Sequence, residues 1–372
     1  MALNTRLLKN KVLTVFFTQS VSLSTWDKVG SIKREVEIYN QLARFFKKIY
    51  FVTYGKDESE IQYSKILKNN IRILPKKVSL LPDRVYVFLV PLLYFKELQE
   101  SDYYKTNQMH GATAALLAKL FFRKKLIIRC GYELLRFYQL KNKPFWKLKL
   151  IYIIEKCTYW LADKIIISSR ENERFILRNF RIKPVAIKVI PNYVNTAFFK
   201  PMRDIRKKER RICCVARLEK QKNISNLIRA MSDMEVELVI YGDGGLKNDL
   251  QLFARQMNTN VVFRGGIPND RLPYEINQSV LFILPSLFEG NPKALLEAMS
   301  CGLPCIGTNV EGIREIIRHK FNGYLCETSS SSIKEAVVTL LNDHALQMEL
   351  GRNAREYAVG TFALDKIFLQ EL

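Results

Sequence analysis

The stretch that decides the fold is Val280–Met299, which reads VLFILPSLFEGNPKALLEAM. Its first five residues form a short apolar run with β-branched and aromatic members, which is typical of a buried strand. The following turn contains Gly290. The Asn291–Pro292 pair predicts a helix start, because Asn is a favoured N-cap and Pro suits the first helical position. We therefore expect a strand, a glycine turn and a capped helix.

This helix start predicts a site for an anion with hydroxyl groups beside it. Free backbone N–H groups and the positive end of the helix dipole lie at the turn. Glu289 precedes the helix, and Glu297 lies about one and a half turns inside it. Carboxylates accept hydrogen bonds from sugar hydroxyls, so the combination favours a sugar nucleotide. The alternative is an ordinary strand–helix unit with solvated glutamates, which short motifs often turn out to be.

The segment resembles the Glu-x7-Glu motif of retaining glycosyltransferases of family 4, which have the GT-B fold. Glu289 and Glu297 have that spacing. Other positions that match the pattern are Gly290, Pro292, Leu296, Ala298, Met299, Gly302 and Pro304. The resemblance implies an α/β protein of GT-B architecture, with two Rossmann-like doubly wound domains facing a central cleft.

The domain organisation follows from length and pattern. A chain of 372 residues suggests two domains, and apolar runs alternate with helical patterns, as in α/β proteins. We predict a basic acceptor-binding domain at 1–195, a linker at 196–210, a nucleotide-sugar domain at 211–356 and a closing helix at 357–372 that packs back on the first domain. Strands expected in the first domain are Val12–Phe17, followed by a polar loop, then Ile49–Tyr54, Ile71–Leu74 and Val85–Leu89.

Site residues follow from the resemblance. Arg217 and Lys222 bracket one strand-to-helix loop, where the family has an Arg and a Lys that neutralise the leaving diphosphate. Read singly, each would be a surface charge. With Glu289 these two make up the expected catalytic set. The expected nucleotide-sugar-binding residues are Glu297, Gly290, Asn291, Pro292, Lys293, Ala294, Gly242, Gly266, Ile267 and Gly30. Gly30, in the turn expected after the first strand, fits an ordinary turn equally well.

One position departs from the family pattern. Where the family often has a His near the transferred sugar, this chain has Arg129-Cys130-Gly131-Tyr132-Glu133. The role of that His is therefore unassigned. His110 stands elsewhere and is expected to cap a helix or pack.

Charge is distributed unevenly along the chain. Residues 1–199 carry 36 Lys/Arg and 15 Asp/Glu, whereas residues 200–372 carry 23 and 21. Within 119–160, basic residues alternate with aromatics. This pattern fits an anionic membrane surface, nucleic acid or a solvated basic helix pair with core aromatics, and we favour the membrane. The residues expected to meet membrane or acceptor are Arg123, Lys124, Lys125, Lys141, Lys143 and Lys147.

The predicted activity is retaining transfer of a hexose or N-acetylhexosamine from a nucleotide-diphosphate sugar, UDP in preference to GDP, to a glycan or lipid-linked acceptor of cell-surface polysaccharide. No Asp-x-Asp pair is present to hold a divalent metal, so neither metal nor other cofactor is expected. The seven cysteines are odd in number and show no CxxC spacing, which indicates reduced thiols in a cytoplasmic protein. No apolar run is long enough to cross a bilayer, so we expect a peripheral protein on the inner face of the cell membrane. The alternatives are a sugar-nucleotide epimerase, a phosphorylase and a non-enzymatic nucleic-acid-binding protein.

Overall fold

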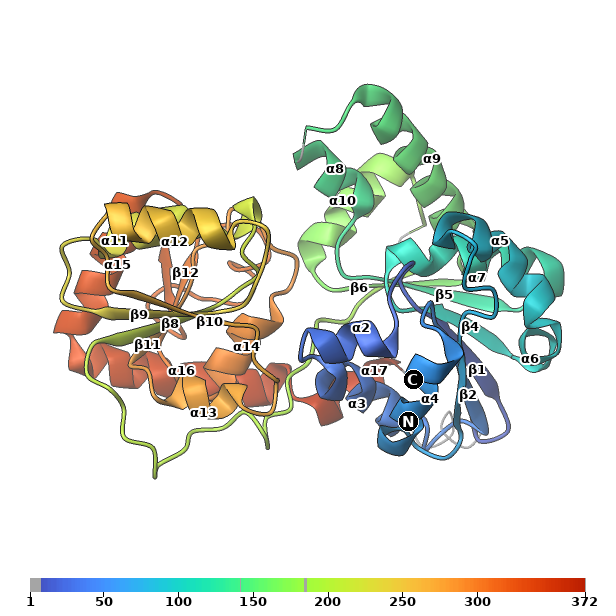
Figure 1. The fold of residues 1–372 in the computed structure, drawn as a ribbon, viewed down its shortest axis with the longest axis horizontal. Coiled ribbons are helices and arrows are strands. Elements are labelled where there is room, and N and C mark those ends of the chain that lie inside the picture. The colour runs from blue at the N-terminus through green and yellow to red at the C-terminus, as the bar shows by residue number, and fades with distance from the viewer. Residues whose placement is uncertain (1–7, 141, 184–185, 372) are drawn as a thin grey trace. The chain divides into compact units, whose positions relative to one another are not determined.

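The computed structural model describes residues 8–140, 142–183 and 186–371. The chain divides into two compact units, Met1–Ile190 with Phe368–Leu372, and Pro191–Ile367. Each unit contains one parallel sheet packed between helices (Figure 1). The predicted α/β class is therefore confirmed.

Unit 1 has a seven-stranded sheet of order β3-β2-β1-β4-β5-β6-β7. Its strands are β1 (Val12–Phe16), β2 (Lys48–Val52), β3 (Ile71–Leu74), β4 (Tyr103–Thr106), β5 (Lys125–Cys130), β6 (Lys164–Ile167) and β7 (Ile187–Val189). Its helices are α2 (Leu23–Lys28), α3 (Ile32–Leu42), α4 (Asp57–Ile61), α5 (Asp83–Leu93), α6 (Phe95–Glu100), α7 (Ala112–Phe122), α8 (Leu134–Leu140), α9 (Phe145–Leu161) and α10 (Arg170–Phe180). The strand order reverses between β1 and β4.

Unit 2 has a six-stranded sheet of order β10-β9-β8-β11-β12-β13. Its strands are β8 (Arg211–Val215), β9 (Glu237–Tyr241), β10 (Val261–Gly265), β11 (Leu281–Leu284), β12 (Cys305–Thr308) and β13 (Tyr324–Cys326). The helices that follow residue 200 are α11 (Ile224–Met231), α12 (Lys247–Gln256), α13 (Leu272–Asn277), α14 (Lys293–Ser300), α15 (Ser330–Asn342), α16 (His344–Thr361) and α17 (Leu364–Glu371). The order reverses between β8 and β11, and this is the pattern of a doubly wound sheet.

The apolar run at the centre of the sequence is a buried strand, as predicted. All four residues of β11 are buried, and the strand lies between β8 and β12. Strands enclosed on both faces read as continuous apolar runs rather than alternating ones. β11 therefore fixes the middle of the unit 2 sheet.

The predicted strand at Val85–Leu89 is wrong, because these residues lie in α5. The run is apolar throughout, which hides the helical period. Burial reveals it: Tyr86, Val87 and Val90 are buried, whereas Val85 and Phe88 are exposed. A run of this length that is buried on one side only satisfies a helix and not a central strand.

Two local predictions also need correction. The segment expected to be a polar loop after β1 contains α2, which Ser22 starts with a capping box. Gly30 therefore follows a helix rather than the strand, and its φ of +70° serves the turn between α2 and α3. The single closing helix expected at 357–372 is interrupted, since α16 ends at Thr361 and α17 begins at Leu364.

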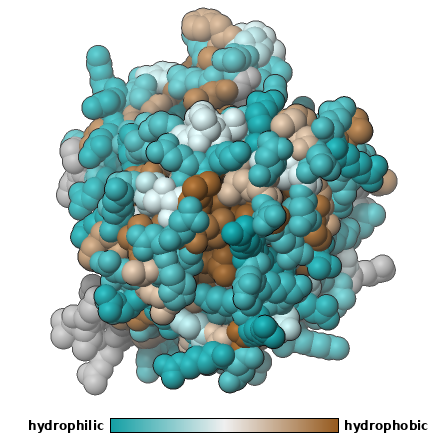
Figure 2. Space-filling view, turned by 90° about the vertical axis from the view of Figure 1, so that its left-hand side faces the viewer, coloured by the Kyte–Doolittle hydropathy of each residue, from teal (hydrophilic) through white to brown (hydrophobic). Residues whose placement is uncertain are grey.

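Exposed apolar side chains are scattered on unit 2. The left-hand side of Figure 1, where α11, α12 and α15 lie, is largely hydrophilic in the space-filling view, with smaller brown areas between teal ones (Figure 2). The large exposed hydrophobics of residues 191–367 are Phe198, Leu252, Tyr274, Leu287, Phe321, Val338 and Met348. They come from separate elements, so they form no continuous apolar stripe on any one helix.

Candidate functional site

The candidate site lies at the point where the strand order of unit 2 reverses. β8 and β11 are neighbours, and all strands of this sheet run parallel. The loops that follow them, 216–223 and 285–292, therefore leave the same edge of the sheet side by side. Ligands of open α/β sheets bind at this place, outside the carboxyl ends of the strands.

Three hydrogen bonds to backbone carbonyl oxygens connect the loops 216–223 and 285–292. Gln221 Nε2 donates to Phe288 O at 2.8 Å, and Leu287 N donates to Gln221 O at 2.8 Å. Asn223 Nδ2 donates to Pro285 O at 3.0 Å, while its backbone is left-handed with φ of +55°. Asn tolerates that conformation better than most residues. Neither Gln221 nor Asn223 was predicted as a site residue, because a polar residue just before a helix is the only signal that the sequence offers for them.

Lys222 and Glu289 form an ion pair across these loops. Lys222 Nζ contacts Glu289 Oε1, and the two side chains are 13% and 7% exposed. Ser286 Oγ donates to the same Oε1 at 2.7 Å. Both contacts use one carboxylate oxygen, so Glu289 Oε2 has no hydrogen-bond partner within the described part of the chain. That oxygen can accept hydrogen bonds from a ligand while the other stays anchored.

The helix start differs in detail from the prediction. α14 begins at Lys293, Pro292 occupies the N-cap, and no side chain caps the helix. The Asn291 side chain instead accepts a hydrogen bond from Asn192 N at 2.9 Å, and Asn192 Nδ2 donates to Asn291 O at 2.6 Å. The predicted Asn cap is wrong because Asn291 is occupied in holding the preceding loop. The first N–H groups of α14 thus lack a side-chain acceptor from the cap.

Glu297 lies on the buried side of α14. Its side chain is 1% exposed, and Asn269 Nδ2 donates to Glu297 Oε1 at 3.3 Å. Asn269 belongs to the loop after β10, so this contact joins a third loop of the same sheet edge to α14. Gly266 and Ile267 lie in that loop too. A Cβ on Gly266 would meet nothing within 4 Å, which leaves space beside it.

Arg217 points away from this cluster. Its guanidinium pairs with Glu219 at 3.1 Å, and the side chain is 68% exposed. Arg217 and Lys222 lie at the start and the end of one loop, but only Lys222 contacts Glu289 in this structure. An exposed Arg with a weak surface partner can change rotamer at little cost.

Two glycines are required by backbone packing at this edge. Gly312 has φ of +80°, and a Cβ there would lie 2.2 Å from Gly290 O. Gly242 has φ of +138°, and a Cβ would lie 2.0 Å from Ala216 O. Gly242 thus permits the β8 and β9 loops to touch. Gly312, in the loop after β12, packs against the Glu289–Gly290 turn, a role that was not predicted from the sequence.

The remaining helix-tip residues lie beside these groups. Ala294 is partly buried against the apolar cluster on this face of the sheet. Lys293 Nζ lies 5.7 Å from the centroid of the Tyr193 ring. Gly30 belongs to unit 1 and lies between α2 and α3, so within its unit it is separate from the turn directly after β1.

In unit 1, the segment 129–133 has no His where the family often has one, and its last residue, Glu133, has a buried carboxyl group. Glu133 is fully buried, and neither carboxyl oxygen has a hydrogen-bond partner in the described chain. Burial raises the pKa of Glu133 to about 8, with a smaller contribution from Glu155. Burial also raises the pKa of Glu155 to about 7, although its oxygens accept from Leu134 N and Leu135 N. His110 is exposed, and its side chain caps no helix in the described part of the chain.

The basic and aromatic segment 119–160 is divided between core and surface. Phe122 packs edge-on against Phe95 at 5.1 Å, and Tyr152 stacks on Phe180 at 5.3 Å. In contrast, Trp146 and Trp160 are 64% and 72% exposed. Of the basic residues named above, Arg123, Lys125 and Lys143 are exposed, Lys124 and Lys147 are half-buried, and Lys141 lies outside the described residues.

Within the described ranges, no group of three or more His, Cys, Asp or Glu side chains is placed to hold a metal ion. Within the same ranges, no helix is both long and apolar enough to cross a bilayer.

Comparison with known proteins identifies relatives for this arrangement. Residues 196–357 match the family model "Glycosyl transferases group 1". The chain is 27% identical over 319 residues to UDP-Gal:alpha-D-GlcNAc-diphosphoundecaprenol alpha-1,3-galactosyltransferase of Escherichia coli, covering 79% of each chain. It is 30% identical over 216 residues to N-acetylgalactosamine-N,N'-diacetylbacillosaminyl-diphospho-undecaprenol 4-alpha-N-acetylgalactosaminyltransferase of Campylobacter jejuni, covering 56% of this chain and 58% of that protein.

The fold has solved counterparts. Sucrose-phosphate synthase of Thermosynechococcus elongatus superposes with a TM-score of 0.80 at 18% identity, covering 97% of both chains. This likeness concerns the fold. The chain has the GT-B fold, and its residues 196–357 are similar to the group 1 glycosyl transferases.

Proposed function

We propose that this protein transfers a hexose or N-acetylhexosamine from a nucleotide-diphosphate sugar, with UDP preferred, to a lipid-linked acceptor in polysaccharide biosynthesis. The observation that carries the proposal is the cluster of Lys222, Glu289 and Ser286 beside the uncapped start of α14, at the switch point of the sheet. The two relatives named above support the donor and acceptor class through their names, one a galactosyltransferase and the other an N-acetylgalactosaminyltransferase.

Each group has a chemical role in this proposal. The N–H groups at the start of α14 bind the diphosphate, since they and the helix dipole favour negative charge. Lys222 stabilises the charge that develops on the departing phosphate oxygen. Glu289 Oε2 accepts from hydroxyls of the transferred sugar, while Glu297 holds the ribose. Arg217 joins Lys222 when it leaves Glu219, whose exposed ion pair is worth little.

We further propose metal-independent transfer with retention of anomeric configuration. Lys222, Arg217 and the helix start supply positive charge where a divalent cation would otherwise act. The leaving phosphate then takes the acceptor proton on the same face of the sugar. Trapping a covalent glycosyl adduct on the protein would contradict this route.

The test is donor turnover by matched lysine variants. The full chain is incubated with a panel of nucleotide sugars, with and without lipid extract, and nucleotide release and the anomeric configuration of the product are measured. Lys222→Gln should lower turnover about 100-fold, the usual scale for removing one group that stabilises the transition state. Lys220→Gln, an exposed lysine of the same loop, should be unchanged. Equal turnover by both variants would refute the assignment.

We propose that unit 1 binds an anionic membrane surface through α9. Trp146, Leu150, Ile153, Cys157 and Trp160 are all exposed, and their spacing of 4, 3, 4 and 3 residues aligns them along one face of the helix. A 17-residue helix is about 25 Å long, so the apolar stripe is long and unburied. Such a stripe with cations at its margins is typical of helices that lie in a lipid interface.

The neighbouring helices extend this surface. α7 packs against both α5 and α9. α5 exposes Val85, Phe88 and Leu92, again on one face, and α7 ends in exposed Leu120 and Phe121. Cations on or next to these helices are Lys96, Lys119, Arg123, Lys124, Lys147, Lys149 and Lys156. Acidic residues such as Asp83, Glu97 and Asp163 are fewer than these cations. The net positive charge would repel a second copy of the same face and attract anionic headgroups.

Vesicle flotation tests the membrane proposal. The full chain should float with vesicles that contain anionic phospholipid, release at high salt, and ignore purely zwitterionic vesicles. The Trp146→Ser/Trp160→Ser double variant should lose flotation while turnover of a water-soluble acceptor persists. The Phe198→Ser variant, which changes an exposed aromatic of unit 2, is the control. Unaltered flotation of the double variant would contradict the role of α9.

A further inference from the structure

Unit 1 contains a cavity that lies apart from the carboxyl edge of its sheet. Its volume is about 340 Å³, within the usual range for small-molecule sites. Lining residues come from the first positions of β4, β5 and β6, and from α3 and α17. Tyr103, Lys125 and Lys164 are each the first residue of their strand, so the cavity lies toward the amino edge of the sheet. The site proposed for transfer lies in the other unit.

The cavity has two kinds of wall. One wall is apolar and aromatic: Leu13 and Leu42 are buried, and Phe46 packs edge-on against Tyr103 with ring centroids 6.4 Å apart. The other wall carries the amino groups of Lys105, Lys125 and Lys164. An interior that combines a ring surface with several cations is suited to a ligand with an apolar body and a negative group.

The cations come from one face of the sheet. Alternate residues of a strand point to the same side, so Tyr103 and Lys105 share a face, as do Lys125, Ile127 and Arg129. Lys164 and Lys188 face the same way on the next strands, paired through Ile127↔Lys164 and Ile166↔Lys188. This side of β4 to β7 therefore carries five cations where most sheets of this type bury aliphatic side chains.

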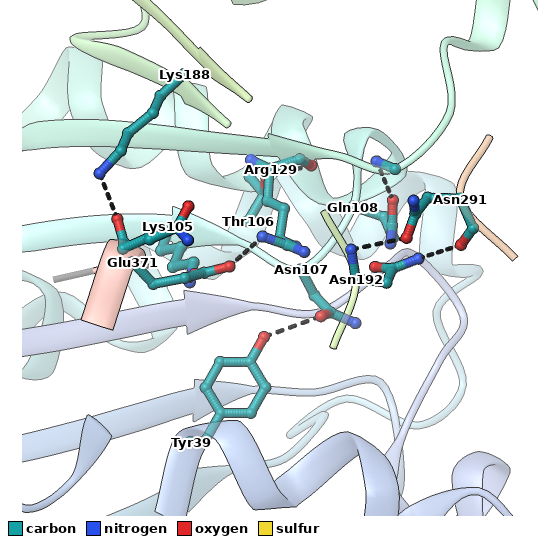
Figure 3. A network of polar contacts seen from close by, with 12 residues as sticks. Tyr39, Lys105, Thr106, Asn107, Gln108, Arg129, Lys188, Asn192, Asn291 and Glu371 are labelled. Carbon is teal, nitrogen blue, oxygen red and sulfur yellow. Dashed lines mark hydrogen bonds and ion pairs between the residues drawn. The ribbon is translucent and has the colours of Figure 1, made fainter. Parts of the chain in front are cut away.

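Part of this charge is neutralised by the end of α17. Glu371 is fully buried in its side chain and contacts both Lys105 and Arg129 (Figure 3). Lys188 Nζ donates to Gln370 O at 2.6 Å, which places a cation at the negative end of a helix. Burial opposes ionisation of Glu371, but Arg129 and Lys105 lower its pKa to about 2. Glu371 is thus an ionised carboxylate that neutralises Lys105 and Arg129.

Two cations of the cavity make no direct contact with a carboxylate among the described residues. Neither Lys125 nor Lys164 makes an ion pair or hydrogen bond with any residue that the structure describes. Asp163, the other carboxylate of the lining, already contacts Lys119 and accepts from Leu126 N at 2.7 Å. Lys164 is half-buried. Burial, and then repulsion from Lys188, lowers its pKa, although attraction to Glu371 opposes this shift.

We propose that this cavity binds a small organic anion, with its phosphate or carboxylate group on Lys125 and Lys164 and its apolar or aromatic body between Leu42, Phe46 and Tyr103. A half-buried ammonium group that faces like charges is stabilised when an anion enters, because the anion returns the interactions lost with water. The ligand would lie against Lys105 and Glu371, so its binding is coupled to the docking of α17.

Calorimetric titration of the full chain tests this site. Phenyl phosphate and inorganic phosphate serve as probes, one with and one without an aromatic body. We expect saturable binding of phenyl phosphate, weakened at least about tenfold by Lys164→Gln, since a charge-assisted contact is worth that much. Phe46→Ala should weaken phenyl phosphate and leave inorganic phosphate unchanged. Lys56→Gln, an exposed lysine of unit 1, and Lys222→Gln should bind like the wild type.

Three results would overturn the proposal. They are no saturable binding of phenyl phosphate, equal affinity in the wild type and Lys164→Gln, or loss of binding in Lys222→Gln, which would locate the anion in unit 2. Folding of each variant is checked by the fluorescence of buried Trp26. If Lys164→Gln does not fold, Lys125→Gln is used instead, because its side chain is exposed and its charge is equally essential to the proposal.

Discussion

Replacing Glu133 by Gln should stabilise unit 1 at alkaline pH. Glu133 is fully buried, and neither oxygen has a hydrogen-bond partner in the described residues. Burial, followed by a smaller effect of the nearby Glu155, raises its pKa from 4.5 to about 8. In the unfolded chain the carboxyl group ionises freely near pH 4.5, whereas in the folded protein it stays protonated up to about pH 8.

The size of the effect follows from linkage between proton binding and folding. Between pH 4.5 and 8 the folded state binds more protons than the unfolded state, so stability falls as pH rises. At about 1.4 kcal/mol for each tenfold difference in proton affinity, the displacement to about 8 corresponds to about 5 kcal/mol. The loss is complete above pH 8 and absent below pH 4.5. Glu133→Gln removes the ionisable group, and with it this part of the pH dependence.

Tryptophan fluorescence isolates the relevant transition. All three tryptophans, Trp26, Trp146 and Trp160, belong to unit 1, so urea unfolding followed by fluorescence reports on that unit. The free energy of unfolding is measured from pH 5 to 9 for the wild type, Glu133→Gln and the exposed control Glu349→Gln. The wild type and the control should lose stability steeply with rising pH. Glu133→Gln should lose about 5 kcal/mol less, and the loss that remains comes from Glu155, whose pKa is raised to about 7. Equal slopes in all three proteins would refute the reasoning.

Two other sets of substitutions test the remaining charged groups. Glu297→Ala should raise the dissociation constant for the donor, whereas Arg217→Ala should mainly lower turnover, and steady-state kinetics separates the two; wild-type values for both would contradict the site assignment. Glu371→Gln should destabilise unit 1 by about 3–5 kcal/mol, because it leaves the buried Lys105 and Arg129 without their carboxylate. Since the pKa of Glu371 falls from 4.5 to about 2 on folding, the wild type should lose stability as pH drops through this interval. Equal acid unfolding curves for the wild type and Glu371→Gln would contradict this expectation.

The sequence specified the centre of unit 2 well because several independent signals coincide there. The apolar run predicts β11, the glycine turn follows it, and the spacing of Glu289 and Glu297 places both on α14 or just before it. Lys222 was also identified, since it falls in the loop after a predicted strand. The strand order then brings the two loops together, because β8 and β11 are neighbours at the reversal.

The sequence failed where tertiary contacts override local preference. Asn291 has the properties of an N-cap, but Asn192, 99 residues away in the chain, occupies it. No local pattern reveals such a contact. The helix α5 was mistaken for a strand because its exposed face is as apolar as its buried one, so periodicity carries no information there. The exposed apolar face of α5 is instead a signal of an interaction surface, and it forms part of the proposed membrane surface.

The cations of unit 1 were also only partly interpretable from sequence. Lys125 was assigned to a membrane surface with its neighbours, because it lies in a basic run. In the structure it begins β5 and lines the cavity together with Lys164. Alternation along a strand separates adjacent basic residues onto opposite faces. A single basic segment can thus supply two different surfaces, and only the strand register distinguishes them.

The ion pair of Lys222 with Glu289 implies a competition that donor binding must resolve. In this structure the lysine contacts the carboxylate, yet the proposed transfer requires its charge on the diphosphate, and a carboxylate beside a diphosphate is repelled. Glu289→Gln removes both the rival anion and the repulsion, so UDP should bind about tenfold more tightly, a modest fraction of the interaction between charges at this range. The same change weakens the acceptor for sugar hydroxyls, so turnover should fall. Calorimetry with UDP and a turnover assay measure the two effects. Weaker binding of UDP by Glu289→Gln would mean that the carboxylate positions Lys222 for the diphosphate rather than competing with it.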